Sequence, residues 1–187
     1  MNSYHPTAIS RNKLSMPMRT LVEKNIIEKD SCLLDFGAGK GDDIKHLREL
    51  GYYCVRGYEP NTPNPDMFID KEEEYIPKYK FDVVTLIYVV NVIEGIEKRK
   101  EIIRRAFYLS KKHFLIAVRT EPIKGVPYKD GVLTKRKTFQ KRYNTKELLE
   151  LIQSALGDLC KHKVIQKVIK PGLVLITKET ACPANNP

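Results

Sequence analysis

A glycine-rich segment preceded by a carboxylate has the residue types best suited to hold a small molecule. It begins at the end of a short apolar run, 32–36, and reads Asp35-Phe36-Gly37-Ala38-Gly39-Lys40-Gly41. Because glycine lacks a Cβ and readily adopts positive φ, the backbone of such a loop can approach a ligand closely. The segment therefore predicts a site for a nucleotide-like cofactor, with Gly37 and Gly39 in contact with it.

Two classes of cofactor that bind to glycine-rich loops do not suit this segment. A loop that cradles a nucleoside triphosphate has the pattern G-x-x-x-x-G-K-[ST], whereas Lys40 is followed here by Gly41 and Asp42. A dinucleotide loop has the pattern G-x-G-x-x-G, whereas this one is G-x-G-x-G, and the carboxylates of Asp42 and Asp43 would repel a pyrophosphate. The sequence therefore disfavours both ATP and NAD.

An adenosine cofactor that carries an amino acid and no phosphate avoids both objections. Asp35 could bind its ammonium group, and Glu59 could accept hydrogen bonds from both ribose hydroxyls. Glu59 lies 22 residues after Gly37, near the spacing expected for the acid that ends the second strand. We therefore expect Asp35 and Glu59 to bind the cofactor.

The elements that must position these residues alternate along the chain in the order of an α/β fold. Strands are predicted at 32–36, 53–59, 81–92 and 113–118, with a short one at 67–69 and a terminal hairpin at 163–169 and 173–177. Helices are predicted at 14–27, 42–50, 97–111 and 146–156. This alternation indicates a mostly parallel central sheet with right-handed crossovers and a C-terminal antiparallel hairpin.

Tyr88 and Asn91 are the candidate active-site residues. They lie at the carboxyl end of the predicted strand 81–92, where open α/β sheets place their ligands. The surrounding segment lacks the Asp/Asn-Pro-Pro-Tyr/Phe motif that holds a base amino group, and the chain has no Pro-Cys nucleophile. Adenine-N6 and cytosine-C5 chemistry by the usual routes is therefore disfavoured.

The segment 119–144 carries an unusual share of the positive charge. The chain has a net charge of +10, and the window 124–146 holds eight basic residues against the single acid Asp130. Such a segment suits the phosphates of a nucleic acid, with aromatic rings available for stacking. Its candidate substrate contacts are Arg119, Lys135, Arg136, Lys137, Arg142 and Tyr143. The alternatives are a solvated basic surface and a lid over the cofactor.

The remaining composition indicates one soluble, cytoplasmic domain, 1–180, followed by a disordered tail, 181–187. No run of eighteen apolar residues and no secretory leader occurs, so neither a membrane span nor export is expected. The four histidines lack metal-ligand spacing, so no metal site is expected. The four cysteines form no C-x-x-C pair, and we expect them to be reduced, with Cys32 and Cys54 as small core residues.

The pattern D-x-G-x-G-x-G, followed by an acid at the next strand end, resembles the motifs of class I S-adenosylmethionine-dependent methyltransferases. The resemblance implies a Rossmann-like class I fold and an enzyme that uses S-adenosylmethionine and releases S-adenosylhomocysteine. It also implies that Pro60 contacts the cofactor and that Asp70 accepts a hydrogen bond from the adenine amino group. No general base is needed to explain such a reaction, because alignment of the acceptor with the methyl group supplies much of the catalysis.

A closer resemblance is to the putative methyltransferases associated with DNA phosphorothioation. The chain departs from that family at Glu59, where aspartate is frequent, and at Pro6, where lysine is frequent. The resemblance implies that the N-terminal segment 1–28 folds over the cofactor and that Arg11 pairs with its carboxylate. The matching segments are 7–11, 14–15, 34–43, 57–60, 88–94, 130–134 and 138–141.

These expectations define a first functional hypothesis and two alternatives. The first is methyl transfer to DNA, or within a DNA modification or restriction-modification system that supplies protein partners. The second is a methyltransferase for RNA or a small molecule. The third is a non-catalytic subunit that binds the cofactor or DNA.

Overall fold

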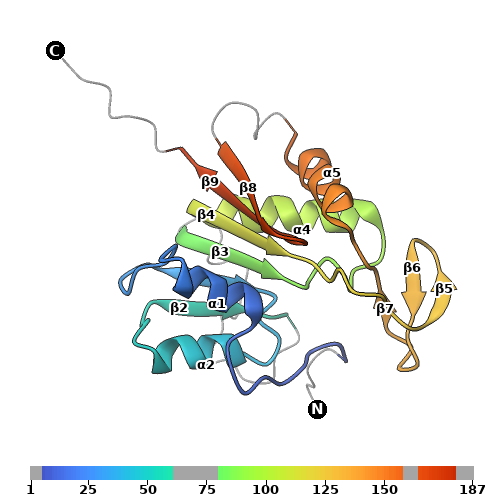
Figure 1. Ribbon diagram of the computed structural model, residues 1–187, viewed down its shortest axis with the longest axis horizontal. Coiled ribbons are helices and arrows are strands. Elements are labelled where there is room, and N and C mark those ends of the chain that lie inside the picture. Colours follow the sequence, from blue (N-terminus) through green and yellow to red (C-terminus); the bar gives the residue numbers. More distant parts are fainter. Residues whose placement is uncertain (1–5, 61–79, 158–163, 180–187) are drawn as a thin grey trace.

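The apolar runs of the sequence form a central sheet of six strands in the described residues, 6–60, 80–157 and 164–179 of the computed structural model (Figure 1). Four neighbouring strands are parallel, and the last two add antiparallel at one edge. In spatial order the strands are β2 (Val55–Tyr58), β1 (Leu33–Phe36), β3 (Phe81–Ile87), β4 (Ser110–Ala117), β9 (Leu173–Lys178) and β8 (Val164–Lys170). This arrangement confirms the mostly parallel sheet and the C-terminal hairpin.

Local signals set the helix ends. The described helices of the layers around the sheet are α1 (Met16–Glu23), α2 (Asp42–Glu49), α4 (Ile96–Leu109) and α5 (Thr145–Leu156). Ser15 caps α1, and Asn144 and Glu147 form a reciprocal capping box on α5. Acidic Asp42 and Asp43 occupy the first turn of α2, where the helix dipole favours negative charge.

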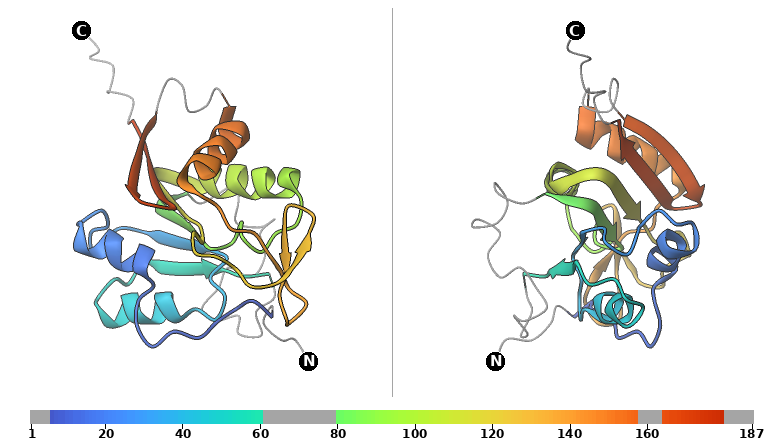
Figure 2. Two further views of the ribbon diagram at one scale, coloured as in Figure 1. Left: turned by 45° about the vertical axis from the view of Figure 1, so that its right-hand side comes forward. Right: turned by 90° about the vertical axis from the view of Figure 1, so that its left-hand side faces the viewer.

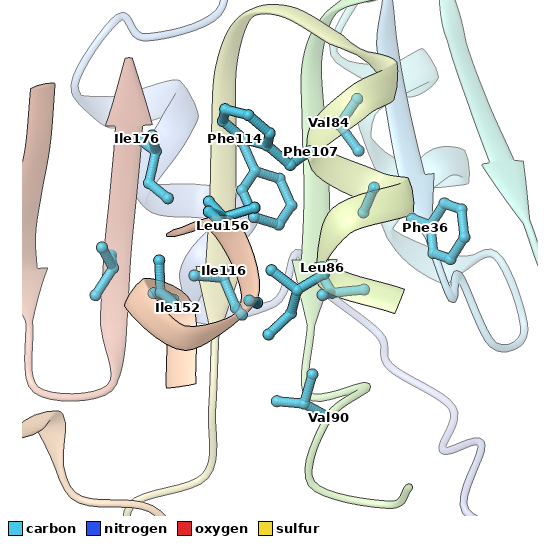
Figure 3. Close-up of a cluster of buried hydrophobic side chains, with 14 of the residues drawn as sticks. Phe36, Val84, Leu86, Val90, Phe107, Phe114, Ile116, Ile152, Leu156 and Ile176 are labelled. Atoms are coloured by element: carbon cyan, nitrogen blue, oxygen red, sulfur yellow. The ribbon is translucent and has the colours of Figure 1, made fainter. Parts of the chain in front are cut away.

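Apolar side chains cover both faces of the sheet, as expected for parallel strands between helices. Even-numbered residues of β1, β3 and β4, such as Leu34 and Phe114, pack with α4 and α5. Figure 3 shows this cluster around Phe107 and Ile152. Odd-numbered residues, such as Leu33, pack with α1 and α2 on the opposite face (Figure 2).

The segment 119–144, predicted as a connection, contains a second sheet of three short antiparallel strands. These are β5 (Val126–Tyr128), β6 (Gly131–Leu133) and β7 (Phe139–Gln140), and Figure 1 shows them beyond the arrowheads of β3 and β4. Arg99, which is 1% exposed, forms a two-pronged ion pair with Asp130 and donates to the carbonyl of Ile93 at 2.7 Å. The small sheet, referred to below as the basic sheet, is thereby fastened to α4.

The described boundaries differ from the predicted ones in one place that affects the site. The strand predicted at 81–92 ends at Ile87, because Tyr88 adopts a positive φ of 60° that breaks the extended backbone. The short strand predicted at 67–69 and the tail 181–187 lie outside the described residues. Within the described ranges no helix is long and apolar enough to span a bilayer.

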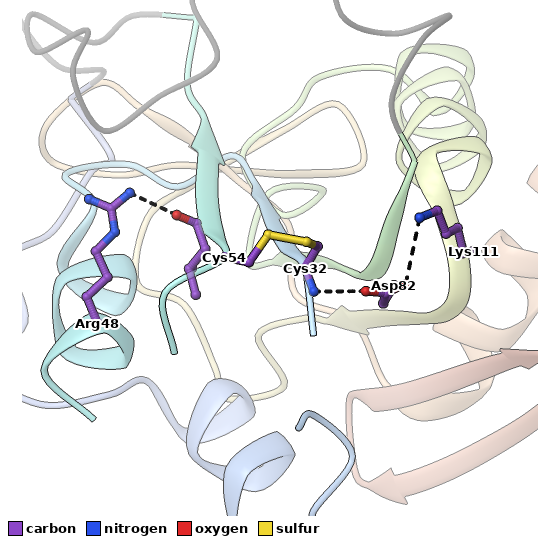
Figure 4. Close-up of a disulfide and its surroundings, with 6 residues drawn as sticks. Cys32, Arg48, Cys54, Asp82 and Lys111 are labelled. Carbon is purple, nitrogen blue, oxygen red and sulfur yellow. Dashed lines mark hydrogen bonds and ion pairs between the residues drawn. A yellow bond between two sulfur atoms is a disulfide. The ribbon is translucent and has the colours of Figure 1, made fainter. Parts of the chain in front are cut away.

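The expectation that Cys32 and Cys54 are reduced core residues was wrong: a disulfide joins them (Figure 4). Each directly precedes one of two paired parallel strands, and the register that sets Leu33 beside Val55 also brings the two cysteines together, with their Cα atoms 4.7 Å apart. The lack of a C-x-x-C motif excludes only local pairs, and the pairing depends on strand register. Cys160 and Cys182 lie outside the described residues.

Reduction of this disulfide is expected to destabilise the protein. Closing a chain between cysteines 22 residues apart restricts the unfolded ensemble by about 3 kcal/mol, which corresponds to a loss of roughly 6–12 °C in Tm on reduction. Thermal unfolding with and without dithiothreitol measures the loss. The double variant Cys32→Ser/Cys54→Ser is the control, and its Tm should not respond to the reductant. An equal response of variant and wild type would contradict the bridge.

Candidate active site

The carboxyl ends of β1, β2 and β3 open into a cavity of about 800 Å³. Its lining comes from the glycine loop, the N-terminal segment, the residues after β2 and β3, and the segments that flank the basic sheet. Since parallel strands end at the same edge of the sheet, this position is the one predicted from the sequence. The cavity brings together nine of the predicted residues: Arg11, Asp35, Gly37, Gly39, Glu59, Pro60, Tyr88, Asn91 and Arg119.

The glycine loop is shaped by close packing against the segment after β3. Gly37 has a φ of 87°, and a Cβ at this position would lie 2.4 Å from the side chain of Val89. Any side chain would therefore force Val89 or the loop to move. The N–H groups of Gly37 and Ala38 both donate to the carbonyl of Tyr58, at 2.7 and 3.1 Å. These contacts hold the loop beside the end of β2.

Glu59 is positioned by the same neighbourhood. Phe36 and Tyr58 are register partners, so the loop after β1 and the residue after β2 lie side by side. One carboxylate oxygen of Glu59 accepts a hydrogen bond from the Gly39 N–H at 3.0 Å. The bond orients the carboxylate at the wall of the cavity, which is the geometry needed to receive ligand hydroxyls.

Asp35 places a carboxyl group deep in the cavity wall, with 4% of its surface exposed. Burial, reinforced by the negative charge of Asp43, raises its pKa from 3.8 to about 7. A hydrogen bond from the Thr85 hydroxyl, 2.8 Å long, partly opposes this rise in pKa. A ligand with a positive charge near Asp35 would stabilise the ionised carboxylate.

The N-terminal segment 7–15 runs along the cavity and is tied down by α2. The carboxylate of Asp42 accepts from the Arg11 N–H, and that of Asp43 accepts from the Ser15 N–H at 2.7 Å. His46 contacts the carbonyl of Arg11 at 3.3 Å. The two acids that argued against a phosphate ligand thus also bind the segment that brings Arg11 to the cavity.

Tyr88 and Asn91 occupy different environments. Tyr88 is half-buried in the cavity wall, and burial together with the nearby Glu121 carboxylate raises the pKa of its phenol. Its positive φ stores backbone strain of the kind that concentrates at functional sites. Asn91 is 1% exposed and bonded on both sides of its amide, to Lys141 and Arg119. This geometry suits Asn91 to holding other segments in place.

The predicted substrate contacts divide into three groups. Arg119 lines the cavity. Lys135, Arg136 and Lys137 are exposed in the turn between β6 and β7, and none forms an ion pair with another described residue. Arg142 is also exposed, and its Nε donates to the carbonyl of Thr120 at 2.7 Å.

Tyr143 does not lie at this surface. It is 2% exposed within the core cluster of α4 and α5, so its ring is not available to stack on a base. Burial raises the pKa of its phenol to about 12. The spacing of aromatic residues within the basic segment did not indicate which of them face the core.

Several cavity residues were not predicted, and one predicted residue is not described. Asp70 lies outside the described residues. Arg105 and Glu121 line the cavity without having been identified from the sequence, and so do Thr7 and Gln140, which lie within segments noted only for the family resemblance. Glu121 and Gln140 belong to the segment 119–144, whose strongest signal in the sequence is its positive charge. In the described part of the chain, no three His, Cys, Asp or Glu residues form a group that could hold a metal ion.

The buried carboxyl of Asp35 should make stability depend on pH. Between pH 3.8 and about 7, folded Asp35 keeps a proton that the unfolded chain has released, so its contribution to the free energy of unfolding falls as the pH rises. Asp35→Asn is therefore expected to be more stable than the wild type by about 2–4 kcal/mol at pH 8, and by less at pH 5.

Urea unfolding at both pH values measures the difference, with Asp30→Asn as the control because Asp30 is exposed in the turn before β1. A gain that did not change with pH, or a loss of stability at pH 8, would contradict the burial of an ionisable Asp35. Weaker cofactor binding by Asp35→Asn is expected alongside the gain in stability.

Comparisons with known proteins agree with this geometry. A family model described as a methyltransferase domain matches residues 9–153. No curated protein sequence gives a significant match. The solved structures described next are 12–15% identical to this chain, so their similarity shows the fold alone.

Three solved structures illustrate that fold. Magnesium protoporphyrin IX methyltransferase from Synechocystis PCC 6803, with bound S-adenosylmethionine, is 15% identical, with a TM-score of 0.56 over 87% of this chain and 76% of that one. A sugar N-methyltransferase from Streptoalloteichus is 12% identical, with a TM-score of 0.57 over 88% and 85%. A chain of an RNA repair complex is 12% identical, with a TM-score of 0.60 over 86% and 40%. The chain belongs to the methyltransferase domain family and has the class I fold of S-adenosylmethionine-dependent methyltransferases.

Proposed function

We propose that the protein transfers the methyl group of S-adenosylmethionine to an acceptor in a nucleic acid, and that this acceptor lies in DNA. The observation that carries the proposal is the composition of the cavity described above. One side holds the glycine loop with the carboxylates of Asp35 and Glu59, and the other side is formed by Arg119 and Gln140 at the base of the basic sheet.

The cavity residues fit the cofactor. The buried carboxyl of Asp35 favours a cationic partner such as the ammonium group, and the carboxylate of Glu59 is oriented to receive the ribose hydroxyls. Arg11 supplies a positive charge for the cofactor's carboxylate. Asp43 adds negative charge, which would repel a phosphate. When bound, the cofactor supplies a methyl group on a positively charged sulfur, and the chain binds and orients it.

The acceptor side supports a polyanionic substrate. The exposed turn 135–137 presents three consecutive cations beyond the cavity, and Arg142 lies on the same segment. Phosphate contacts from such side chains provide affinity without sequence preference. Support for DNA in particular comes from the sequence resemblance to phosphorothioation-associated proteins, and membership of such a modification system stays part of the proposal. The RNA repair neighbour favours RNA as the second candidate.

Transfer of a labelled methyl group tests this function. The protein is incubated with S-adenosylmethionine labelled in its methyl group and with unmodified duplex DNA, single-stranded DNA or total RNA. We expect label in DNA. Label in RNA alone would show that the acceptor lies in RNA and would contradict the assignment to DNA. Label in none of these pools, with cofactor binding intact, would contradict the nucleic-acid acceptor and favour a small-molecule enzyme or a non-catalytic subunit.

A charge-removal variant tests the role of the exposed turn, with equilibrium binding to the nucleic acid that the wild type labels measured over a range of salt concentrations. Lys135→Ala/Arg136→Ala/Lys137→Ala should weaken nucleic-acid binding by at least about tenfold. The slope of the logarithm of the binding constant against the logarithm of the salt concentration should become shallower by the equivalent of roughly three phosphate contacts. Cofactor affinity should not change. The matched control is Lys111→Ala/Lys112→Ala, because these exposed lysines lie near the start of β4, at the opposite end of the sheet. An equal effect of both variants would show a nonspecific charge effect.

A further inference from the structure

Asn91 joins three chain segments into one wall of the cavity. Its side-chain oxygen accepts from the Arg119 N–H at 3.0 Å, and its side-chain amide donates to the Lys141 carbonyl at 2.6 Å. Its own carbonyl accepts from the Lys141 N–H at 2.7 Å. The segments after β3, after β4 and after β7 are therefore held at fixed positions relative to one another.

This wall presents four side chains to the cavity: Tyr88, Arg119, Glu121 and Gln140. They lie away from the glycine loop in sequence and come from the side where the acceptor is proposed to enter. Tyr88 is fixed at its backbone by the bond from its N–H to the Ala117 carbonyl, 2.9 Å long. Arg119 is fixed by Asn91 and by the Tyr143 N–H, which donates to its carbonyl at 3.0 Å.

Glu121 differs from the other carboxylates that line the cavity. Asp35 accepts a hydrogen bond from Thr85, Asp43 from the Ser15 N–H, and Glu59 from the Gly39 N–H. Glu121 has no hydrogen bond or ion pair with any residue of 6–60, 80–157 or 164–179. Its carboxylate is therefore available to a group that enters the cavity.

Glu121 and Tyr88 line the same cavity, and the negative charge of Glu121 acts on the Tyr88 phenol. After burial, Glu121 makes the largest contribution to the raised pKa of Tyr88. The other charged groups that act on this phenol are Arg11 of the N-terminal segment and Asp43 of α2. Arg105 of α4 and Arg119 also line the cavity.

We propose that Glu121 takes the proton released by the acceptor during methyl transfer, so that the acceptor atom is a neutral oxygen or nitrogen carrying hydrogen. This inference rests on the proposed function and specifies its chemistry. The lone pair of the acceptor atom forms a bond to the methyl carbon while the carbon–sulfur bond breaks, and its electron pair stays on sulfur. The hydrogen on the acceptor leaves as a proton to the Glu121 carboxylate. Tyr88 keeps its proton and can hydrogen-bond the acceptor.

The placement of Glu121 can be tested without catalysis. In protein labelled with ¹³C in tyrosine, the Tyr88 resonance is assigned by its loss in Tyr88→Phe and followed as the pH is raised. In Glu121→Gln the titration of Tyr88 should move to lower pH, because a nearby negative charge has been removed. Glu150→Gln is the control, since Glu150 is 65% exposed on α5 and neither it nor its ion-pair partner Lys146 lines the cavity. An unchanged Tyr88 titration in Glu121→Gln would overturn the placement.

The role of Glu121 as proton acceptor is tested by single-turnover methyl transfer to whichever nucleic-acid pool the wild type labels. Glu121→Gln should lower the rate by about 10²–10⁴-fold with the dissociation constant of S-adenosylmethionine unchanged, and Glu121→Asp should recover part of the rate. A rate equal to that of the wild type and of Glu150→Gln would overturn the role. Absence of labelling by the wild type would contradict the proposed function, whereas the Tyr88 titration would still decide where Glu121 lies.

Discussion

The pairing of β1 with a parallel strand on each side is the constraint on which the site depends. Its register sets Phe36 beside Tyr58 and Asp35 beside Thr85, so that the residues after three strands reach one edge of the sheet together. The glycine loop then lies against Glu59 on one side and Val89 on the other. At the opposite end of β1 and β2 the same register brings the two bridged cysteines together.

The electrostatics of the cavity follow from this crowding. Burial of Asp35, and after it the negative charge of the nearby Asp43, raises the pKa of Asp35. Burying a charge in this way costs stability unless a partner compensates it. A cationic ligand would provide that compensation, as expected if Asp35 binds the ammonium group in the proposed function. The basic sheet adds charge of the opposite sign outside the cavity, where a polyanion would approach.

Much of the cofactor side could be predicted from the sequence, because its signals are local. The spacing of the glycines and the acid before them indicate a loop between a strand and a helix. Glu59 is recognisable because it follows the second strand. The position of Tyr88 followed from the end of an apolar run, although its positive φ shortened that strand to Ile87. The closer resemblance to phosphorothioation-associated proteins stays a prediction, since the family match establishes only the methyltransferase domain.

The features that escaped prediction all depend on contacts between distant segments. The disulfide requires the register of β1 and β2, and the bonds of Asn91 require the segments after β4 and β7 to meet beside it. The strands of the basic sheet contain two or three residues each, too few for a periodic pattern. In the same segment, the sequence shows the basic residues directly. The burial of Tyr143 and the exposure of Glu121 depend on how the segment packs and are seen only in the structure.

We expect this cavity to bind an adenosyl amino acid and to exclude phosphate-bearing nucleotides. Thermal unfolding of the wild type and of Glu59→Ala, each with S-adenosylmethionine, S-adenosylhomocysteine, NAD or ATP, tests it most directly. At about 100 times its dissociation constant, a ligand stabilises the folded state by ~2.7 kcal/mol, or roughly 5–10 °C for a chain of this size. We expect such a shift with each of the two adenosyl compounds for the wild type, and no such shift for Glu59→Ala. A shift with ATP or NAD, or no shift with either adenosyl compound, would contradict it.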